Sequence, residues 1–488
     1  MSRYLRQLAK SDYVKLALIM ALAFYLAFIP HLGYAYPIHV DEWVNLALAK
    51  AMLKAGNASF VDPFYGQSVV SPGSYLETGY LVFWGVFQQV SGISWLTIFR
   101  YFPGVIFMMT VLSVYILARR QGFGWEAAFF TALIPTTVGI LGPAFMVPVA
   151  LGLLFIPLCL FITFNLRSVW AYLMLFVFVA FLLTIHPPTA VGLVIIMVPY
   201  ALLNLRGNLK IALGAILILM VPFFVLFPWI FQLVLTTARS LFTPAPLPTW
   251  VDIPRVIFTY GTLPVAICLL GAFVLAMRGS RQSYSLALGL LALLLMLVVK
   301  YTFNYGPYIM YYRGLMYMML MMAVVAGAGL MAVRKLPLAE VLQPWLRVPP
   351  ITRQAGNALC LVLVVLTLVA AIPTRQDIPY YHMIDSQDYA AFAWIKDNVG
   401  ADYPKAMLDP WKATAFTAIT GKLVYSRIHS FPMDTDEAAA AFLSDNASDT
   451  AFLRENGISI IYTSLPVRND DLAEVSPGVY LLGGNKSP

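Results

Sequence analysis

The stretch YVKLALIMALAFYLAFIPHLGYAYPIHVDEW (Tyr13–Trp43) joins a long apolar run to two adjacent carboxylates. Its apolar part, residues 13–33, is long enough to cross a bilayer, whose hydrocarbon core takes about 20 apolar residues per helix. Basic residues precede the run in the charge order of a signal peptide, but no small-residue cleavage site follows it. We therefore expect a retained first membrane span, with acidic residues beyond its outer end.

The composition of the whole chain points to the same solvent. Of its 488 residues, 60% are hydrophobic and 11% are charged, whereas soluble domains carry about 25% charged residues. A water-soluble fold of this size could not bury so much apolar surface. The three cysteines lie within apolar runs and lack the spacing of a disulfide framework or a zinc site. The sequence predicts a polytopic α-helical membrane protein.

Apolar runs continue along the chain, and about 11–13 transmembrane helices are expected, of which we favour 11. The favoured spans are 13–33, 97–118, 125–142, 146–165, 169–186, 188–205, 211–233, 256–277, 284–303, 308–333 and 356–373. Basic residues gather in alternate turns between them, which the positive-inside rule assigns to the cytoplasm. The N-terminus is then cytoplasmic and the C-terminal region extracytoplasmic, in a multi-pass protein of the cytoplasmic membrane.

Residues 75–90 disturb this count. They are apolar enough to cross but contain Glu77 and two glutamines. If they crossed, every later basic turn would change side, which the positive-inside rule disfavours. We therefore expect a re-entrant or interfacial helix there.

The charge also divides the chain. From Thr374 onward there are 15 acidic and 9 basic residues, a net charge of −6, and the rest carries 22 basic and 8 acidic residues, +14. The overall +8 thus reports membrane topology, and no nucleic-acid partner is expected. We expect a transmembrane domain over 1–373, with a long first external loop at 34–95, and a small external α/β domain over 374–488.

Helix and strand patterns alternate in this C-terminal region. Helices are expected at 385–398 and 411–421, with a capping box at Asp434–Glu437 opening another. Strands are expected at 405–409, 422–426, 458–464 and 478–483. The alternation predicts a two-layer or three-layer α/β fold.

The segment His39-Val-Asp41-Glu42-Trp43 is the strongest candidate site. Only 8 acidic residues precede Thr374, and two of them are adjacent here. A carboxylate pair suits a general base or a ligand of a divalent cation such as Mg²⁺ or Mn²⁺. The alternative is structural, because acids also favour the N-terminus of a helix, here one over residues 43–56.

These features together resemble the GT-C glycosyltransferases: a first span, Asp41-Glu42 opening a long external loop, many further spans and an external C-terminal domain. Residues 92–120, which include Arg100, also resemble the third-helix region of mannosyltransferase-like members. The superfamily includes oligosaccharyltransferases, protein mannosyltransferases and aminoarabinose transferases, which take sugars from polyprenyl-phosphate donors. The resemblance implies that Asp41 is the catalytic base or a metal ligand and that Glu42 assists it.

The chain departs from the family's pattern at two places. Oligosaccharyltransferases carry a WWDYG motif, where this chain has only Asp409-Pro-Trp411-Lys412, so transfer to asparagine is not expected. The second external turn, residues 142–148, lacks the acid that mannosyltransferase-like members often keep. Asp62 and Glu77 are candidates to replace it.

Other candidate substrate-binding residues lie at expected outer helix ends, and they are His39, His186, Asn304, Tyr308 and Arg313, with Arg239 and Arg255 as weaker candidates in the loop 234–255. His186 precedes two prolines and suits a donor phosphate, a metal or simply a helix cap. Arg313 lies inside an apolar span, where burying a cation costs about 2.5–3.5 kcal/mol. Its partner is then the Asp41-Glu42 pair or the donor's phosphate, and the alternative is snorkelling to the headgroups.

The sequence thus favours a membrane glycosyltransferase that uses a polyprenyl-phosphate sugar donor and an unidentified glycan, lipid or protein acceptor, surrounded by membrane lipid. One alternative is a transporter or flippase, which would place ionisable residues near the membrane midplane. Another is a non-catalytic membrane partner protein. The second alternative requires Asp41 to be engaged in helix capping or to point away from any cleft.

Overall fold

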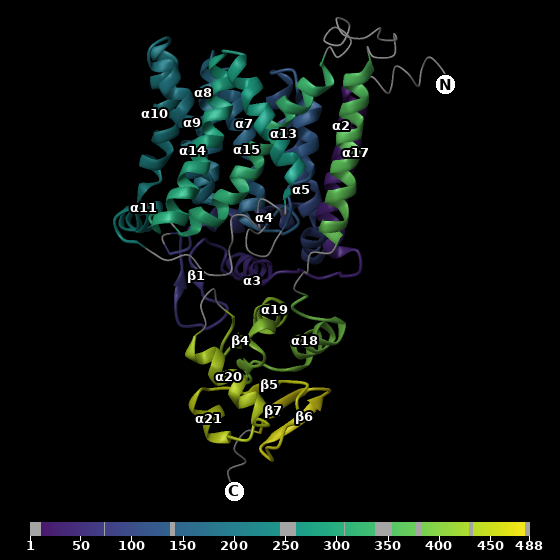
Figure 1. Ribbon diagram of the computed structural model, residues 1–488. Coiled ribbons are helices and arrows are strands. Elements are labelled where there is room, and N and C mark those ends of the chain that lie inside the picture. Colours follow the sequence, from purple (N-terminus) through teal and green to yellow (C-terminus); the bar gives the residue numbers. More distant parts are fainter. Residues whose placement is uncertain are drawn as a thin grey trace, which may run out of the picture. The chain divides into compact units, whose positions relative to one another are not determined.

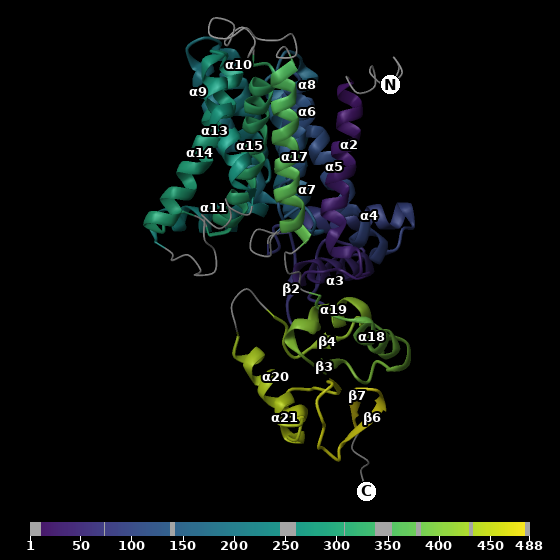
Figure 2. The ribbon, with the colours of Figure 1, turned by 45° about the vertical axis from the view of Figure 1, so that its right-hand side comes forward.

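The computed structural model describes residues 11–72, 74–136, 142–244, 260–306, 308–336, 354–376, 382–428 and 433–483. Contacts divide the chain into two compact units (Figures 1 and 2). Unit 1 comprises Met1–Leu32 and Tyr101–Pro379, and unit 2 comprises Gly33–Arg100 and Tyr380–Pro488. The first loop therefore groups with the C-terminal region, whereas the sequence division at 373/374 assigned it to the transmembrane part.

Unit 1 is a bundle of helices (Figure 1). Its described helices are α2 (Asp12–Phe28), continued by the 3-10 turn Ile29–His31, α5 (Trp95–Arg119, which starts in unit 2), α6 (Gly124–Ala132), α7 (Pro148–Thr163), α8 (Val169–Ile185), α9 (Pro187–Leu205), α10 (Leu209–Val225), α11 (Phe227–Phe242), α13 (Thr262–Met277), α14 (Arg281–Phe303), α15 (Tyr308–Arg334) and α17 (Ala355–Gln376). In the described residues, 6 helices are long and apolar enough to span a membrane, and four shorter apolar helices accompany them. Ten of the eleven favoured spans contain one of these ten helices, whereas in the span 125–142 the described helix α6 has only 9 residues and ends at Ala132.

Helix α15 lies at the centre of this bundle. The segment Arg313–Arg334 is the most buried of the candidate spans. Small residues allow its close packing: Gly329 meets the backbone of α13 at Ile267, and Gly327 meets the backbone of α6 at Ala127. Such small-residue contacts are how helices associate in lipid, where no hydrophobic force draws them together. An ion pair of 2.7 Å between Glu126 Oε1 and an Arg334 guanidinium nitrogen also joins α6 to α15.

Two further spans end differently from their sequence boundaries. The span at 211–233 is divided into α10 and α11 at Leu226, and Pro228 occupies the first turn of α11. Proline is favoured there because its missing N–H is not needed. In the first span, the α-helix stops at Phe28 before a 3-10 turn that contains Pro30.

Unit 2 contains the first loop and a five-stranded sheet. The loop forms α3 (Val40–Ala55), the hairpin β1 (Phe60–Val61) and β2 (Val69–Val70), and α4 (Thr78–Ser91). The C-terminal part forms α18 (Ser386–Asn398), β3 (Lys405–Met407), α19 (Pro410–Thr420), β4 (Leu423–Val424), α20 (Asp434–Ser444), α21 (Thr450–Glu455), β5 (Ile460–Tyr462), β6 (Leu472–Ser476) and β7 (Val479–Leu482). At 1.5 Å per residue, α4 measures only about 21 Å against a hydrocarbon core of about 30 Å, a length that favours an interfacial or re-entrant helix.

The sheet has the strand order β4-β3-β5-β7-β6. β3 pairs in parallel with β4 and β5, whereas β7 pairs antiparallel with β5 and β6. Side chains alternate across it: Ile461 packs with Phe442 and Leu453 of α20 and α21, and its neighbour Tyr462 packs against Phe392 of α18, whose ring also contacts Phe416 of α19. Helices therefore cover both faces in a three-layer arrangement.

The C-terminal region follows its sequence pattern with three differences. Helix α21 (Thr450–Glu455) was not expected. Strand β6 was not expected, and it forms the edge of the sheet beside β7. The capping box of α20 begins one residue earlier than expected, because Met433 N–H donates to Asp436 Oδ2 at 3.1 Å. Asp436, rather than Glu437, is the acid that closes the first turn.

Hydrogen bonds attach the first loop to the C-terminal part of unit 2, and among them the Ile384 N–H donates to the Tyr34 hydroxyl at 3.4 Å. The Tyr34 hydroxyl donates to the Ile384 carbonyl (2.7 Å), and the Lys50 ammonium donates to the Ala418 carbonyl at the end of α19 (2.7 Å). The Val424 N–H of β4 donates to the Phe64 carbonyl (2.9 Å). Helix α3 packs against α19 between these points, so the loop and the α/β layers form one body.

Candidate functional site

The N-terminus of α3 is closed by His39 and Glu42. His39 Nδ1 accepts the Asp41 N–H at 3.1 Å, and Glu42 Oε2 accepts the N–H groups of Ile38 (2.7 Å) and His39 (2.9 Å). This is a capping box, which satisfies backbone donors that have no partner inside the helix. Glu42 is fully buried. The helix-opening role is thus filled without the Asp41 carboxylate.

Asp41 is the accessible acid of the pair. Its side chain is 49% exposed, and its Oδ2 lies 3.9 Å from His39 Nδ1. That nitrogen already accepts the Asp41 N–H, so its lone pair is directed at the backbone. The adjacent carboxylates therefore differ in environment: Glu42 is held by the fold, and Asp41 faces out of the first turn of α3.

Tyr75 lies within the electrostatic influence of both Asp41 and a third acid, Glu77. The Tyr75 hydroxyl donates to Asn45 Oδ1 at 2.8 Å. Burial raises the pKa of this hydroxyl well above its ordinary value, and the negative charges of Glu77 and Asp41 raise it further, against the opposing charge of Arg427. Glu77, one of the two candidate replacement acids, thus lies in the same neighbourhood as Asp41.

The other candidate acid, Asp62, has a structural role. Its Oδ1 accepts the Phe64 N–H at 2.8 Å, and its carbonyl accepts the Gly66 N–H at 3.0 Å. These bonds close the turn between β1 and β2, a common use of aspartate.

The residues around Asp41 do not assemble a metal site by themselves. No group of three or more His, Cys, Asp or Glu side chains within the described ranges is placed to hold a metal ion. His39 Nδ1 is used by the backbone, and Glu42 accepts two backbone N–H groups. Within the described residues His39 and Glu42 are therefore engaged with the backbone, and the role of Asp41 as a ligand of Mg²⁺ or Mn²⁺ stays a prediction.

In unit 1, His186 belongs to a buried polar cluster. It caps α9: its Nδ1 accepts the Thr189 N–H at 3.2 Å and lies 2.6 Å from Thr189 Oγ1. Thr189 Oγ1 lies 2.9 Å from the Tyr317 hydroxyl of α15. All three side chains are almost completely buried. The helix-cap interpretation of His186 is therefore satisfied by geometry, and its partners come from two helices.

Two glycines make room for this cluster. A Cβ atom on Gly152 of α7 would stand 2.7 Å from Thr189 Oγ1, and one on Gly192 of α9 would stand 2.7 Å from the Tyr317 ring. Real Cβ atoms do not approach so closely. The close packing of α7, α9 and α15 at the cluster thus depends on both glycines.

Arg313 lies beside this cluster. It is partly buried on α15, at one end of the candidate span Arg313–Arg334, and its charge acts on the His186 ring. Tyr317 follows it by four residues, so both side chains lie on one face of α15. The cluster, through Tyr317, therefore lies one helical turn from Arg313 along α15.

The remaining candidates have other placements. Asn304 ends α14 in the left-handed conformation with a φ of 60°, and its carbonyl accepts the Lys300 ammonium at 3.0 Å. Arg239 is exposed on α11. The backbone of Tyr308 begins α15, but its side chain and all of Arg255 lie outside the described residues.

Three residues of these polar clusters were not among the sequence candidates. Each follows a candidate residue at helical spacing. Asn45 follows Asp41 by four residues, Thr189 follows His186 by three, and Tyr317 follows Arg313 by four. A search for polar residues at these spacings could have found them. Tyr75 and Arg427 carry no such signal, because they come from distant parts of the chain.

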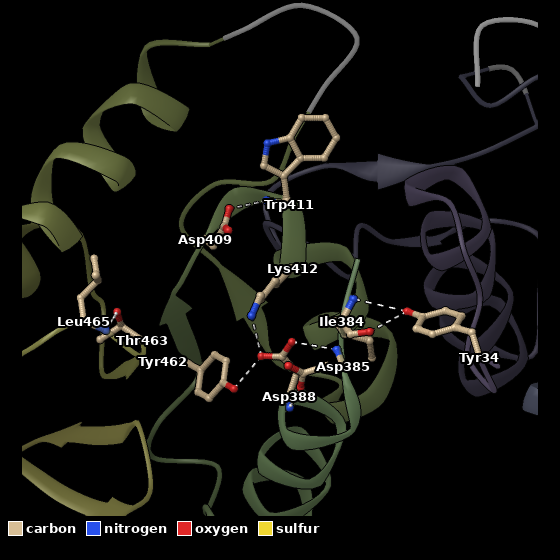
Figure 3. Close-up of polar contacts among 10 residues, drawn as sticks. All are labelled: Tyr34, Ile384, Asp385, Asp388, Asp409, Trp411, Lys412, Tyr462, Thr463 and Leu465. Carbon is tan, nitrogen blue, oxygen red and sulfur yellow. Dashed lines mark hydrogen bonds and ion pairs between the residues drawn. The ribbon is translucent and has the colours of Figure 1, made fainter. Parts of the chain in front are cut away.

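The segment Asp409-Pro-Trp411-Lys412 begins α19. Asp409 Oδ1 caps the helix by accepting the Trp411 N–H at 3.0 Å. Figure 3 shows Lys412 pointing toward Asp388 and Tyr462, whereas the Trp411 indole points away from them. Lys412 therefore belongs to the polar cluster around Asp388, whereas the Trp411 indole points out of that cluster.

Comparisons with known proteins give structural likeness without sequence likeness. No protein-family model and no curated protein sequence matches the chain. The fold is similar to the oligosaccharyltransferase of Archaeoglobus fulgidus in its apo form, with a TM-score of 0.64, 11% identity, and coverage of 93% of this chain and 69% of the other. That protein has also been solved with an inhibitory peptide and a dolichol-phosphate.

Two other similar structures widen the comparison. ArnT from Cupriavidus metallidurans has a TM-score of 0.54 at 13% identity, with 96% of this chain and 99% of the other covered, and it has been solved bound to undecaprenyl phosphate. The arabinofuranosyltransferase AftD from Mycobacteria has a TM-score of 0.58 at 15% identity, over 96% of this chain and 40% of its own. The chain therefore has the fold of the GT-C membrane glycosyltransferases, with its membrane helices in unit 1 and a small C-terminal sheet in unit 2.

Proposed function

We propose that the protein is a membrane glycosyltransferase that transfers a sugar from a polyprenyl-phosphate donor to an acceptor on the extracytoplasmic side. The fold supports the class of enzyme, and similar structures contain a dolichol-phosphate or undecaprenyl phosphate. The observation that carries the proposal is the accessible Asp41 carboxylate in the first turn of α3, beside a Glu42 that already closes the helix. Because Asp41 is spared from capping and its side chain is 49% exposed, its carboxylate is available to a substrate.

Asp41 is the proposed general base. An acceptor hydroxyl loses its proton to the Asp41 carboxylate while its oxygen bonds to the anomeric carbon of the donor sugar. The bond from that carbon to the phosphate oxygen breaks on the opposite face, so the configuration inverts and the polyprenyl phosphate leaves. Base catalysis of this kind contributes about 10²–10⁴-fold to a rate.

Arg313 is the proposed ligand of the donor's phosphate. A guanidinium binds phosphate oxygens through paired N–H donors. His186 and Tyr317 belong to the buried polar cluster that begins one helical turn from Arg313 on α15. Arg239 and Arg255 are proposed as secondary phosphate contacts, with Asn304, Tyr308 and His39 near the substrates.

The test uses a strain whose chromosomal copy is deleted. We expect polyprenyl-phosphate sugars to accumulate in it, and lipid extracts analysed by liquid-chromatography mass spectrometry will identify them. Wild-type protein removes the accumulated donor, whereas Asp41→Asn, which changes only the charge, is expected to lower transfer at least about 100-fold. Asp62→Asn is the matched control, since its carboxylate closes a turn elsewhere in the loop. Full complementation by Asp41→Asn at equal protein level would refute the assignment of the base.

A further inference from the structure

The α/β part of unit 2 contains a cavity of about 410 Å³. Ligand-binding clefts commonly have volumes of about 300–1,000 Å³. The cavity lies between the starts of α18 and α19, the helix α20 and the segment that follows β5. A second cavity, of about 500 Å³, shares Asp385, Asp388 and Lys412 with it and extends to residues 33–36 and 382–384. The proposed transfer mechanism uses neither cavity.

The floor of the first cavity is fixed by Asp388 (Figure 3). This carboxylate is 3% exposed, and its Oδ1 accepts both the Lys412 ammonium and the Tyr462 hydroxyl at 2.7 Å. Its Oδ2 accepts the Asp385 N–H at 2.9 Å. Burial, followed by the hydrogen bond to Asp388, raises the pKa of Tyr462 above its ordinary value, so the hydroxyl stays protonated as a donor. Three segments of chain are thus held by one buried acid.

The rim carries hydrogen-bonding groups that the fold leaves unused. Asp385 and Asp409 each use one carboxylate oxygen to cap a helix, through the N–H groups of Asp388 (2.8 Å) and Trp411 (3.0 Å). Within the described residues their second oxygens make no hydrogen bond, nor do the Gln387 amide and the Ser464 hydroxyl, all of which line the cavity. Lys412 has also committed only one of its three protons, to Asp388.

The charges and hydrogen-bonding groups of the lining indicate which class of ligand the cavity can bind. Three carboxylates against one ammonium make the lining acidic, which disfavours a phosphate or another anion. An amine would meet the Lys412 ammonium and would leave the donors of Gln387 and Ser464 unused. Neighbouring hydroxyl groups both donate and accept, so they match carboxylate acceptors that stand beside amide, hydroxyl and ammonium donors.

We propose that this cavity binds a neutral saccharide unit of the acceptor. The inference rests on the proposed function in calling that saccharide the acceptor, and it makes the acceptor a glycan rather than an unglycosylated lipid or protein. The Asp388–Lys412–Tyr462 floor holds the cavity open, and the rim of Asp385, Gln387 and Asp409 binds the hydroxyl groups. The second cavity lets a chain of more than one unit continue past the floor.

The experiment is saturation-transfer-difference NMR on the full chain in lipid nanodiscs. The probes are maltose, cellobiose and mannobiose, with glucosamine and glucose 6-phosphate as the amine and anion comparators. The variant D385S/Q387A/D409S keeps an oxygen at both helix caps, because serine also caps, but removes the second carboxylate oxygens and the amide. The matched control D397S/D402S removes two exposed acids of the same region that do not line the cavity.

We expect at least one neutral disaccharide to bind the wild type, with binding weakened about tenfold or more in the rim variant, because the variant loses hydrogen bonds to charged carboxylates. The control should bind as the wild type does. Absence of binding by every neutral disaccharide, preference for either comparator, or unchanged binding by the rim variant would each overturn the proposal. Asp41→Asn should bind the probes normally, so a failure of the proposed transfer chemistry leaves this binding result intact and distinguishable.

Discussion

At the scale of single residues, two adjacent acids have separate tasks because of helix geometry. Successive residues of an α-helix point about 100° apart. Position 42 is the third residue of α3, where a glutamate can reach back to the backbone before the helix, whereas position 41 turns toward solvent. Adjacency in sequence therefore indicated a site, but the division of labour follows from the register of the helix.

This division predicts that the two acids differ in how much they contribute to folding stability. Glu42→Ala leaves the N–H groups of Ile38 and His39 without their acceptor, which should cost about 1–3 kcal/mol of folding free energy. Asp41→Ala loses only a favourable contact with the helix dipole, about 0.3–1 kcal/mol. Thermal unfolding followed by tryptophan fluorescence measures both. Equal losses in the two variants would contradict the assigned roles.

Sequence alone found Asp41, Glu42, His186 and Arg313 because each is a polar residue at an expected helix end. It could not place Tyr75 beside Asp41, because no local rule relates positions 41 and 75. It also left His186 open between a ligand and a cap, and the cap became visible only with the bonds to Thr189. Burial and partners are properties of the folded chain rather than of a pattern.

At the scale of elements, apolar runs were sufficient to locate the membrane helices, because their length is set by the bilayer. Breaks inside a run were harder to predict: α10 ends and α11 begins within a single apolar stretch. Strand β6 was missed because Leu472–Ser476 has mostly exposed residues and lacks an apolar alternation. It forms only by pairing with β7, a long-range cause.

Helix packing gives a test at this scale. Gly192→Ala places a methyl group against the Tyr317 ring and should separate α9 from α15, at a cost of about 1–3 kcal/mol. It should also weaken transfer, since the cluster borders Arg313. Gly400→Ala is the control, because an added Cβ there meets nothing within 4 Å. Unfolding temperature and transfer rate are compared in the same preparation, and a Gly192→Ala protein as stable as the control would show that the contact is not required.

At the scale of the whole molecule, the first loop and the C-terminal region fold together. The bond between Tyr34 and Ile384 joins residues 350 positions apart. The Tyr34 ring also stacks on His382 with centroids 3.9 Å apart. No periodicity in the sequence could reveal this association, which is why the sequence division separated the two segments.

The same tyrosine makes the stability of unit 2 sensitive to alkali. Burial raises the pKa of Tyr34 above its ordinary value of about 10. Above pH 10 the unfolded chain therefore loses this proton while the folded chain keeps it, so stability falls as pH rises. Tyr34→Phe should be less stable at pH 8, through loss of the bond to Ile384, but should lose less between pH 8 and 11. Tyr389→Phe, whose hydroxyl makes no hydrogen bond within the described residues, is the control, and identical pH profiles for Tyr34→Phe and wild type would refute the effect.

The attachment of α3 to α19 has a consequence for protein engineering. A chimera that exchanges only the segment after Tyr380 would replace the residues whose backbone carbonyls accept from Tyr34 and Lys50, together with the strand that meets Phe64. The graft would thereby disturb the packing of α3, the helix that carries Asp41, although no residue near Asp41 in sequence had been altered. Transplanting specificity from one such protein to another therefore requires moving residues 33–100 and 380–488 as a matched pair.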